Sequence, residues 1–254
     1  MKIPRLIGIG IILVTLLVTQ LFAGGYILKQ KQHTDPMKMM GFTQPAKDEI
    51  VTTWLTSDKI RSDQGNQSVY LFLDQKKMIL VNHENKSWSE MPLNLEQTLN
   101  AAMEKAEGSE EEKQKFSEMT RGLMKMKITV TPTGETRKIG QWNCKKYLQT
   151  LETAMGPNQS IIWASEDIKL DYEVYSKLMA AVFSSQPGMG QMMSDMLKEL
   201  KKIKGVPVLT ETTVKMMNME MKSTQELLEV KEADIPDDVF TVPAGYKKKD
   251  VFTQ

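Results

Sequence analysis

The chain is poor in the residues that carry metal, redox or nucleophilic chemistry. Among its 254 residues there are one cysteine, Cys144, and two histidines, His33 and His83. A zinc site needs several Cys or His ligands and an internal disulfide needs two cysteines, so neither is expected. The sequence also contains no phosphate loop, dinucleotide fingerprint or nucleophile elbow. We therefore predict no catalytic residue, no metal ligands, no cofactor and no enzymatic activity, with an enzyme kept as a less favoured alternative.

An excess of positive charge is also lacking. The 33 basic side chains are balanced by 32 acidic ones, which gives a formal net charge of +1. Proteins that bind nucleic acid neutralise phosphates with surplus lysine and arginine. The composition therefore predicts no nucleic-acid partner.

A long apolar run occurs at the amino terminus. Lys2 and Arg5 precede an apolar stretch over residues 6–18, and Ala23 offers a small residue for cleavage before Gly24. This is the layout of a bacterial secretory signal. The run is shorter than the ~20 residues that span a bilayer, which favours cleavage over an uncleaved anchor. We predict a periplasmic or secreted protein, with tethering to the inner membrane by this segment as the alternative.

The rest of the chain alternates between strand and helix patterns. We expect residues 24–47 to form a leader or spacer that contains a partial strand, and residues 48–254 to form one domain. Short β-branched and aromatic runs over 50–91, 128–164 and 206–231 predict antiparallel strands. Apolar stripes with helical spacing at 93–127 and 172–202 predict amphipathic helices, the second broken at Pro187–Gly190. Helices inserted between runs of strands indicate an α+β domain with its helices on one face of a sheet.

Four phrases of the sequence carry a family resemblance. They are Ile60-Arg61-Ser62-Asp63, the stretch 134–140, the stretch 142–147 and the tail 235–246. Over about residues 45–250 the chain resembles a secreted bacterial domain family of unknown function that is similar to the periplasmic lipoprotein carriers of the LolA/LolB type. The resemblance implies a curved antiparallel sheet, an incomplete barrel, whose concave face is covered by helices and holds acyl chains. It also implies an arginine that holds the lid, for which Arg61, Arg121 and Arg137 are the candidates.

Methionine is unusually frequent, with 20 residues, and three groups of them lie over 37–40, 189–196 and 216–221. Clustered thioethers can bind Cu(I). Methionine also fills irregular apolar gaps and forms adaptable hydrophobic surfaces. Because no histidine accompanies the clusters, we favour an apolar surface or core over a copper site.

Large aromatic residues and Cys144 are expected in predicted strands. Tryptophans there usually pack in a core, and ligand stacking is the alternative. We expect Cys144 to be a buried, unreactive thiol and both histidines to be exposed without partners.

These observations predict a non-enzymatic periplasmic binding protein that holds an apolar ligand, such as lipid acyl chains, between the sheet and lid helices. Its partner would be a lipid or a lipid-modified protein. The alternative is a module with a filled core that contacts or senses an envelope protein. The predicted ligand-lining residues are apolar side chains of strands and helix faces: Trp54, Trp88, Phe116, Met119, Leu123, Trp163, Leu178, Met179, Val182, Met192 and Met196.

Overall fold

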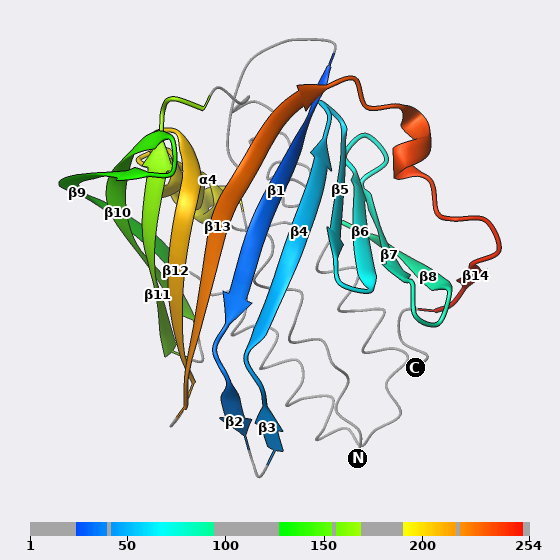
Figure 1. Ribbon diagram of the computed structural model, residues 1–254, viewed down its shortest axis with the longest axis horizontal. Coiled ribbons are helices and arrows are strands. Elements are labelled where there is room, and N and C mark those ends of the chain that lie inside the picture. Colours follow the sequence, from blue (N-terminus) through cyan, green and yellow to red (C-terminus); the bar gives the residue numbers. More distant parts are fainter. Residues whose placement is uncertain are drawn as a thin grey trace.

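A computed structural model describes residues 24–39, 42–93, 127–153, 156–168, 190–216 and 219–250. These residues form mainly one large, curved sheet of twelve strands that is not closed (Figure 1). The strand order is β14-β8-β7-β6-β5-β4-β1-β13-β12-β11-β10-β9, so β14 and β9 are its edges. All neighbouring strands are antiparallel except β14, which pairs with β8 in parallel. The predicted antiparallel sheet is confirmed.

The strands of the large sheet, in chain order, are β1 (Gly25–Thr34), β4 (Lys47–Leu55), β5 (Lys59–Gln64), β6 (Gln67–Phe72), β7 (Lys77–Asn82), β8 (Ser87–Pro92), β9 (Lys127–Ile139), β10 (Trp142–Thr153), β11 (Gly156–Ser165), β12 (Val206–Met216), β13 (Met219–Ala233) and β14 (Lys247–Lys248). A separate two-stranded sheet consists of β2 (Met37–Met39) and β3 (Phe42–Gln44), which extends beyond the end of β1 and the start of β4 (Figure 1). The helical elements within the described ranges are α4 (Gly190–Leu200) and the 3-10 helix η3 (Asp237–Phe240).

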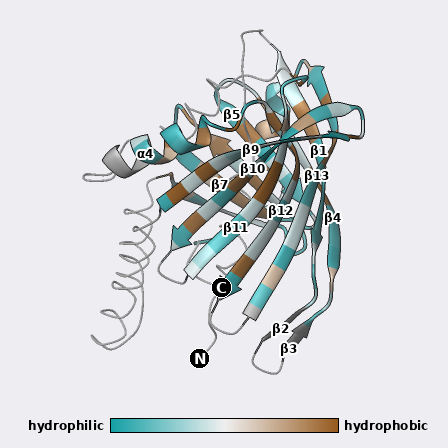
Figure 2. Ribbon diagram, turned by 90° about the vertical axis from the view of Figure 1, so that its left-hand side faces the viewer, coloured by the Kyte–Doolittle hydropathy of each residue, from teal (hydrophilic) through white to brown (hydrophobic). Residues whose placement is uncertain are grey.

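The strands follow from an alternation of apolar and polar residues. In β4 the side chains of Val51, Thr53 and Leu55 are buried while Thr52 and Trp54 between them are only partly buried. Successive side chains of a strand point to opposite faces, so this alternation places one face against a core. In β9 the buried Ile128 and Val130 alternate with exposed residues in the same way, and Figure 2 shows hydrophobic bands between hydrophilic ones along the strands on this side of the sheet.

The segment 24–47, predicted to be a leader, contributes to the centre of the sheet. Its residues from Gly25 to Thr34 form β1, which pairs with β13 on one side and β4 on the other. The sheet therefore begins at Gly25 rather than at Asp48. The polar residues that suggested a spacer lie on this strand beside Tyr26 and Leu28, which pack in core clusters.

Strand β9 continues without interruption to Ile139, and the turn into β10 lies at residues 140–141. Gly134 has a φ of +80°, and the register against β10 shifts between Lys145 and Tyr147. The glycine thus accommodates an irregularity in a continuous strand, in which three residues of β9, 133–135, lie opposite Lys146 of β10 and local backbone distortion absorbs the two extra residues.

The helical content observed is smaller than an α+β domain implies. The helix α4 confirms the second half of the segment predicted at 172–202, and its residues Met193, Met196, Leu197 and Leu200 have the i, i+3, i+4, i+7 spacing of an amphipathic helix. Of the helices predicted over 93–127 and 172–202, residues 94–126 and 172–189 lie outside the described residues. Those ranges that the structure describes are mostly β, and within them no helix is both long enough and apolar enough to cross a bilayer.

The sheet has two faces, which we name by what packs on them. The helix face carries α4, which packs on Tyr147 and Ile162 and lies inside the curve of the sheet (Figure 1). Strand pairing extends this face from Ile162 through Thr210 and Gln225 to Gln32 in β1. The tail face is the opposite one. The chain after β13 crosses to the β5–β8 side of the sheet and packs on its tail face (Figure 1).

Candidate functional site

Apolar side chains of three clusters lie on the helix face: Leu28 and Leu227 belong to one, and α4 belongs to another. Met196 and Leu200 of α4 pack on Val130, Tyr147 and Ile162 of β9, β10 and β11. We call this the α4 cluster. All five side chains are at least nine-tenths buried.

A carboxylate fixes α4 to the edge strand. Glu199 Oε1 accepts a hydrogen bond from Lys202 at 2.6 Å, and its Oε2 accepts one from the backbone N–H of Val130 at 2.8 Å. The Lys202 contact, followed by the Val130 contact, holds the pKa of Glu199 below its usual value. The helix is therefore positioned over β9 by charge-assisted hydrogen bonds as well as by apolar packing.

Another apolar cluster lies over β4 to β7 and does not include α4. It consists of leucine and isoleucine side chains that are 4–6% exposed, with three partly buried residues around them. We call it the meander cluster. Its buried members are Leu55, Ile60, Leu71, Leu73 and Leu93, and the partly buried residues are Tyr26, Val69 and Met78.

Amide and hydroxyl side chains run across the helix face from β10 to β6, beside the α4 cluster and the meander cluster. Strand register makes them neighbours from strand to strand. We call this set the polar band. It comprises Gln149, Ser160, Thr210, Thr212, Gln225, Gln30, Gln32, Glu49, Gln64 and Gln67.

Hydrogen bonds link members of the polar band across four central strands. Gln64 Nε2 donates to Glu49 Oε2 at 2.9 Å and to Gln32 Oε1 at 3.3 Å. Gln225 Nε2 donates to Gln30 Oε1 at 3.0 Å. Buried polar side chains need such partners, because an unmet hydrogen bond in a protein interior costs free energy.

The polar band continues toward the α4 cluster on β12, β11 and β10. The hydroxyls of Ser160 and Thr212 are hydrogen-bonded at 3.0 Å. Gln149, next to Ser160 in the register, is 4% exposed, and its Oε1 atom has no hydrogen-bond partner among the described residues. A buried acceptor without a donor is thus available at the border of the α4 cluster.

On the tail face, Arg61 joins the sheet to the C-terminal tail. Its guanidinium lies 5.0 Å from the Trp54 ring and 5.1 Å from the Tyr70 ring. It donates to both carboxylate oxygens of Asp63 at 2.8 and 2.7 Å, and to the carbonyl of Val239 at 2.7 Å. Two of the phrases that carried the family resemblance, 60–63 and the tail 235–246, therefore meet at this arginine.

A second connection to the tail runs through a histidine. The ring nitrogens of His83 lie 2.7 Å from Ser68 Oγ and 2.9 Å from Tyr246 Oη. A serine beside a histidine resembles a nucleophile and its base. Both His83 ring nitrogens are engaged and Ser68 is buried at 1% exposure, so these contacts connect the tail to the sheet. We group these contacts with those of Arg61 as the tail clasp.

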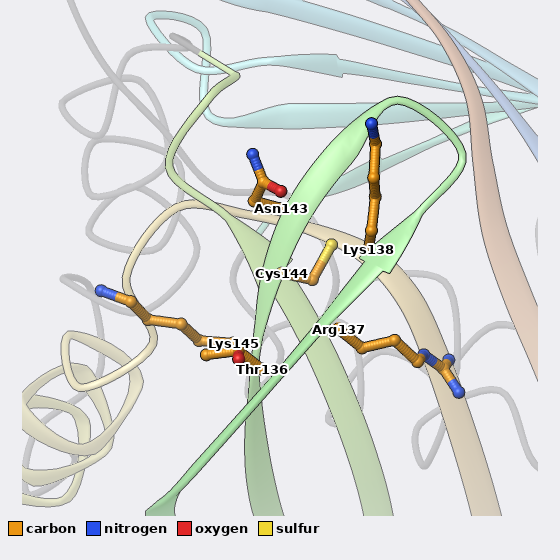
Figure 3. A pocket seen from close by; sticks show the side chains of 6 residues that line it. All are labelled: Thr136, Arg137, Lys138, Asn143, Cys144 and Lys145. Atoms are coloured by element: carbon orange, nitrogen blue, oxygen red, sulfur yellow. The ribbon is translucent and has the colours of Figure 1, made fainter.

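A surface pocket of about 430 Å³ lies at the β9–β10 hairpin. Its cationic side chains, Arg137, Lys138 and Lys145, point away from one another (Figure 3), and Lys145 is paired with Glu166 at 2.7 Å. Cys144 also lines it but is 1% exposed, and burial raises the pKa of its thiol. The expected burial of Cys144 is confirmed, and the diverging cations do not form an anion site.

The structure separates the described residues that were predicted to line a ligand. Met196 lies on the helix face in the α4 cluster. Trp54 and Trp88 are on the tail face, where Trp54 contacts Arg61 and Trp88 packs on the tail-face core. Trp163 is 7% exposed beneath Arg137, whose guanidinium is 4.3 Å from its ring. The remaining predicted residues are outside the described ranges or, for Met192, have no described side chain: Phe116, Met119, Leu123, Leu178, Met179, Val182 and Met192.

The two histidines differ from the expectation that they are exposed and unpartnered. His33 lies 3.1 Å from both Asp48 and Asp35, at the base of the β2–β3 hairpin, and His83 belongs to the tail clasp. Sequence spacing could not reveal these partners, because they come from different strands. The candidate lid arginines are also placed apart from the helix face: Arg61 is in the tail clasp, Arg137 covers Trp163, and Arg121 lies outside the described residues.

The fold and the helix face define an open, curved-sheet domain with an apolar and amide-lined inner surface. The chain belongs to the family described as a domain of unknown function (DUF4412), whose model matches residues 34–246. No curated protein matches the sequence.

Two solved structures are similar to the chain at low scores. One is PNGF-II, with 14% identity, a TM-score of 0.38 and 90% of this chain covered. The chain spans about a third of that protein, 31% of its length. The other is an outer membrane lipoprotein-sorting protein domain from Vibrio parahaemolyticus, with 7% identity, a TM-score of 0.34, and coverage of 87% of this chain and 90% of that one.

Proposed function

We propose that this protein is an exported, non-enzymatic binding protein that holds acyl chains on the helix face. The observation that supports this most is the presence of apolar clusters on one face of the curved sheet, of which α4 contacts one. Removing a hydrocarbon chain from water is favourable by about 0.8 kcal/mol per CH₂. Binding of a lipid, or of the lipid portion of a modified protein, would be favoured by this free energy if its acyl chain packed against the meander cluster.

The lid in this proposal is the pair of amphipathic helices that the sequence predicts over 93–127 and 172–202. Their apolar stripes would cover the apolar side chains of the helix face. The predicted break at Pro187–Gly190, which ends where α4 begins, would serve as the hinge. Residues 1–23, which have the layout of a secretory signal, support a periplasmic location, cleaved or tethered.

A second candidate function is supported by the burial of the meander cluster. Its five core side chains are only 4–6% exposed, as expected of a filled interior. In that case the protein contacts or senses another envelope protein and carries no lipid. The two functions differ in whether an acyl chain can displace what covers the helix face.

Binding of a fluorescent fatty-acid analogue distinguishes these functions. Val69, on the helix face, is partly buried beside the meander cluster, whereas Ile50 is 51% exposed on the tail face. We expect saturable binding by the native protein, an affinity at least about fivefold lower for Val69→Gln, and an unchanged affinity for Ile50→Gln. Absence of saturable binding, or equal effects of the two substitutions, would contradict acyl-chain binding on this face.

A further inference from the structure

The polar band gives the helix face a chemical character beyond the apolar clusters. Gln149 lies between Tyr147 and Leu151 on the same strand face, next to Val130 and Ser160 of the neighbouring strands. Its Oε1 atom is buried and has no donor in the part of the chain that the structure describes. A buried carbonyl oxygen of this kind is stabilised by a ligand that brings an N–H or O–H group.

The charges of the band restrict the kind of group that fits. Its members are amides and hydroxyls apart from Glu49, and Glu49 Oε1 is paired with Lys47 at 2.6 Å. The neighbouring Gln64 donates to the other oxygen of Glu49. A phosphate or carboxylate placed here would be desolvated near a carboxylate without a free cation in the band, which is unfavourable. An uncharged hydrogen-bonding group avoids that cost.

We propose that the polar band binds an uncharged amide or hydroxyl group attached to the acyl chain, with Gln149 Oε1 accepting its hydrogen bond. The protein then selects N-acyl amides and hydroxylated lipids over fatty acids and simple esters of the same chain length. This inference rests on the proposed acyl-chain binding and identifies the chemical class of the ligand.

The site also explains how one ligand can contact both kinds of surface. Gln149 borders the α4 cluster through Tyr147, so a hydrocarbon chain can lie on apolar side chains while its polar group reaches the amide. Beyond it, Ser160 and Thr212 offer hydroxyls that donate or accept. The polar group would therefore be positioned by one unpaired acceptor and by hydroxyls that can adjust.

The test is competition against the fluorescent fatty-acid analogue by four compounds of one chain length: an N-acyl glycinamide, a long-chain alcohol, a fatty acid and its methyl ester. We expect the amide and the alcohol to bind the native protein about fivefold or more tightly than the other two. Gln149→Met should remove this preference while leaving the ester's affinity unchanged. Gln159→Met is the matched control. Gln159 lies in the same pair of strands, β10 and β11, but it is exposed and points to the tail face.

The outcomes separate this inference from the function on which it rests. Equal affinities of the native protein for all four compounds would overturn the role of the polar band and leave acyl-chain binding intact. Failure of every compound to compete, with no saturable probe binding, would overturn acyl-chain binding itself. If Gln149→Met does not fold, the preference of the native protein and its loss in Thr212→Val still decide the question, because the Thr212 hydroxyl lies in the band beside Ser160 and on a different strand from Gln149.

Discussion

Replacing Arg61 by methionine tests whether the tail clasp holds the C-terminal tail on the sheet. Methionine retains much of the packing between Trp54 and Tyr70 but removes the guanidinium. The substitution eliminates the bidentate contact with Asp63 and the hydrogen bond to the carbonyl of Val239. Asp63 then becomes a partly buried carboxylate without its principal partner.

The expected cost follows from the exposure of the two charged side chains, 19% for Arg61 and 28% for Asp63. Exposed ion pairs contribute about 0–1 kcal/mol, whereas removing one partner of a buried pair costs about 3–5 kcal/mol. The pair lies between these limits and also provides a hydrogen bond to the tail. We expect Arg61→Met to lower the free energy of unfolding by about 2–4 kcal/mol.

The assay is equilibrium unfolding in guanidinium chloride followed by circular dichroism, together with limited proteolysis of the tail. Arg137→Met is the matched control, since Arg137 also stacks on a tryptophan but is exposed; we expect it to cost less than about 1 kcal/mol. Faster cleavage of the tail should accompany only Arg61→Met. Equal stabilities of the two variants would refute the role assigned to Arg61.

Three further predictions concern the sheet and its thiol. Removing residues 24–47 deletes β1 from the centre of the sheet, so the truncated chain should lack a cooperative unfolding transition; a native-like circular dichroism spectrum and melt would contradict this. Gly205→Ala should lower the free energy of unfolding by more than about 2 kcal/mol in chemical unfolding, because φ is +90° and the added Cβ would clash with the Ser165 carbonyl oxygen. Gly134→Ala, whose Cβ would have no atom within 4 Å, should cost about 1 kcal/mol. Equal costs would be inconsistent with the clash. Burial raises the pKa of Cys144, so its thiol stays protonated at neutral pH. Maleimide labelling should therefore be slow in the native protein and faster in denaturant. Rapid stoichiometric labelling of the native protein would exclude a buried thiol.

The strands after Asp48 could be predicted because local patterns determine them. Alternating β-branched and aromatic residues, separated by short polar turns, indicate antiparallel hairpins without knowledge of distant contacts. Strands β4 to β8 follow that rule, as does the hairpin of β10 and β11. The helix α4 was likewise expected from the spacing of its apolar residues.

The central position of β1 could not be predicted from its own residues. Its partners, β13 and β4, lie on opposite sides of it and one of them is near the end of the chain. After the apolar start Tyr26–Leu28, Lys29, Lys31 and His33 alternate with Gln30 and Gln32, so most of the strand has polar residues on both faces and lacks the usual apolar signal. The sequence of such a strand does not identify it as central; its position follows only from the strands that pair with it.

The polar band was missed for a related reason. Its glutamines lie on strands far apart in sequence, and each alone is typical of a solvated strand position. Gln30 and Gln149 are nevertheless buried, at 5% and 4% exposure. The signal that could have identified them is their place at alternate positions beside buried apolar residues, such as Leu28 before Gln30 and Tyr147 before Gln149.

The most direct test of acyl-chain binding is native mass spectrometry, with organic extraction, of the protein purified from a bacterial periplasm without detergent. We expect a bound species of lipid mass at about one per protein, and recovery of a molecule with an acyl chain in the extract. A clean unliganded mass, with no acyl compound extracted, would contradict the account and favour the protein-interaction function.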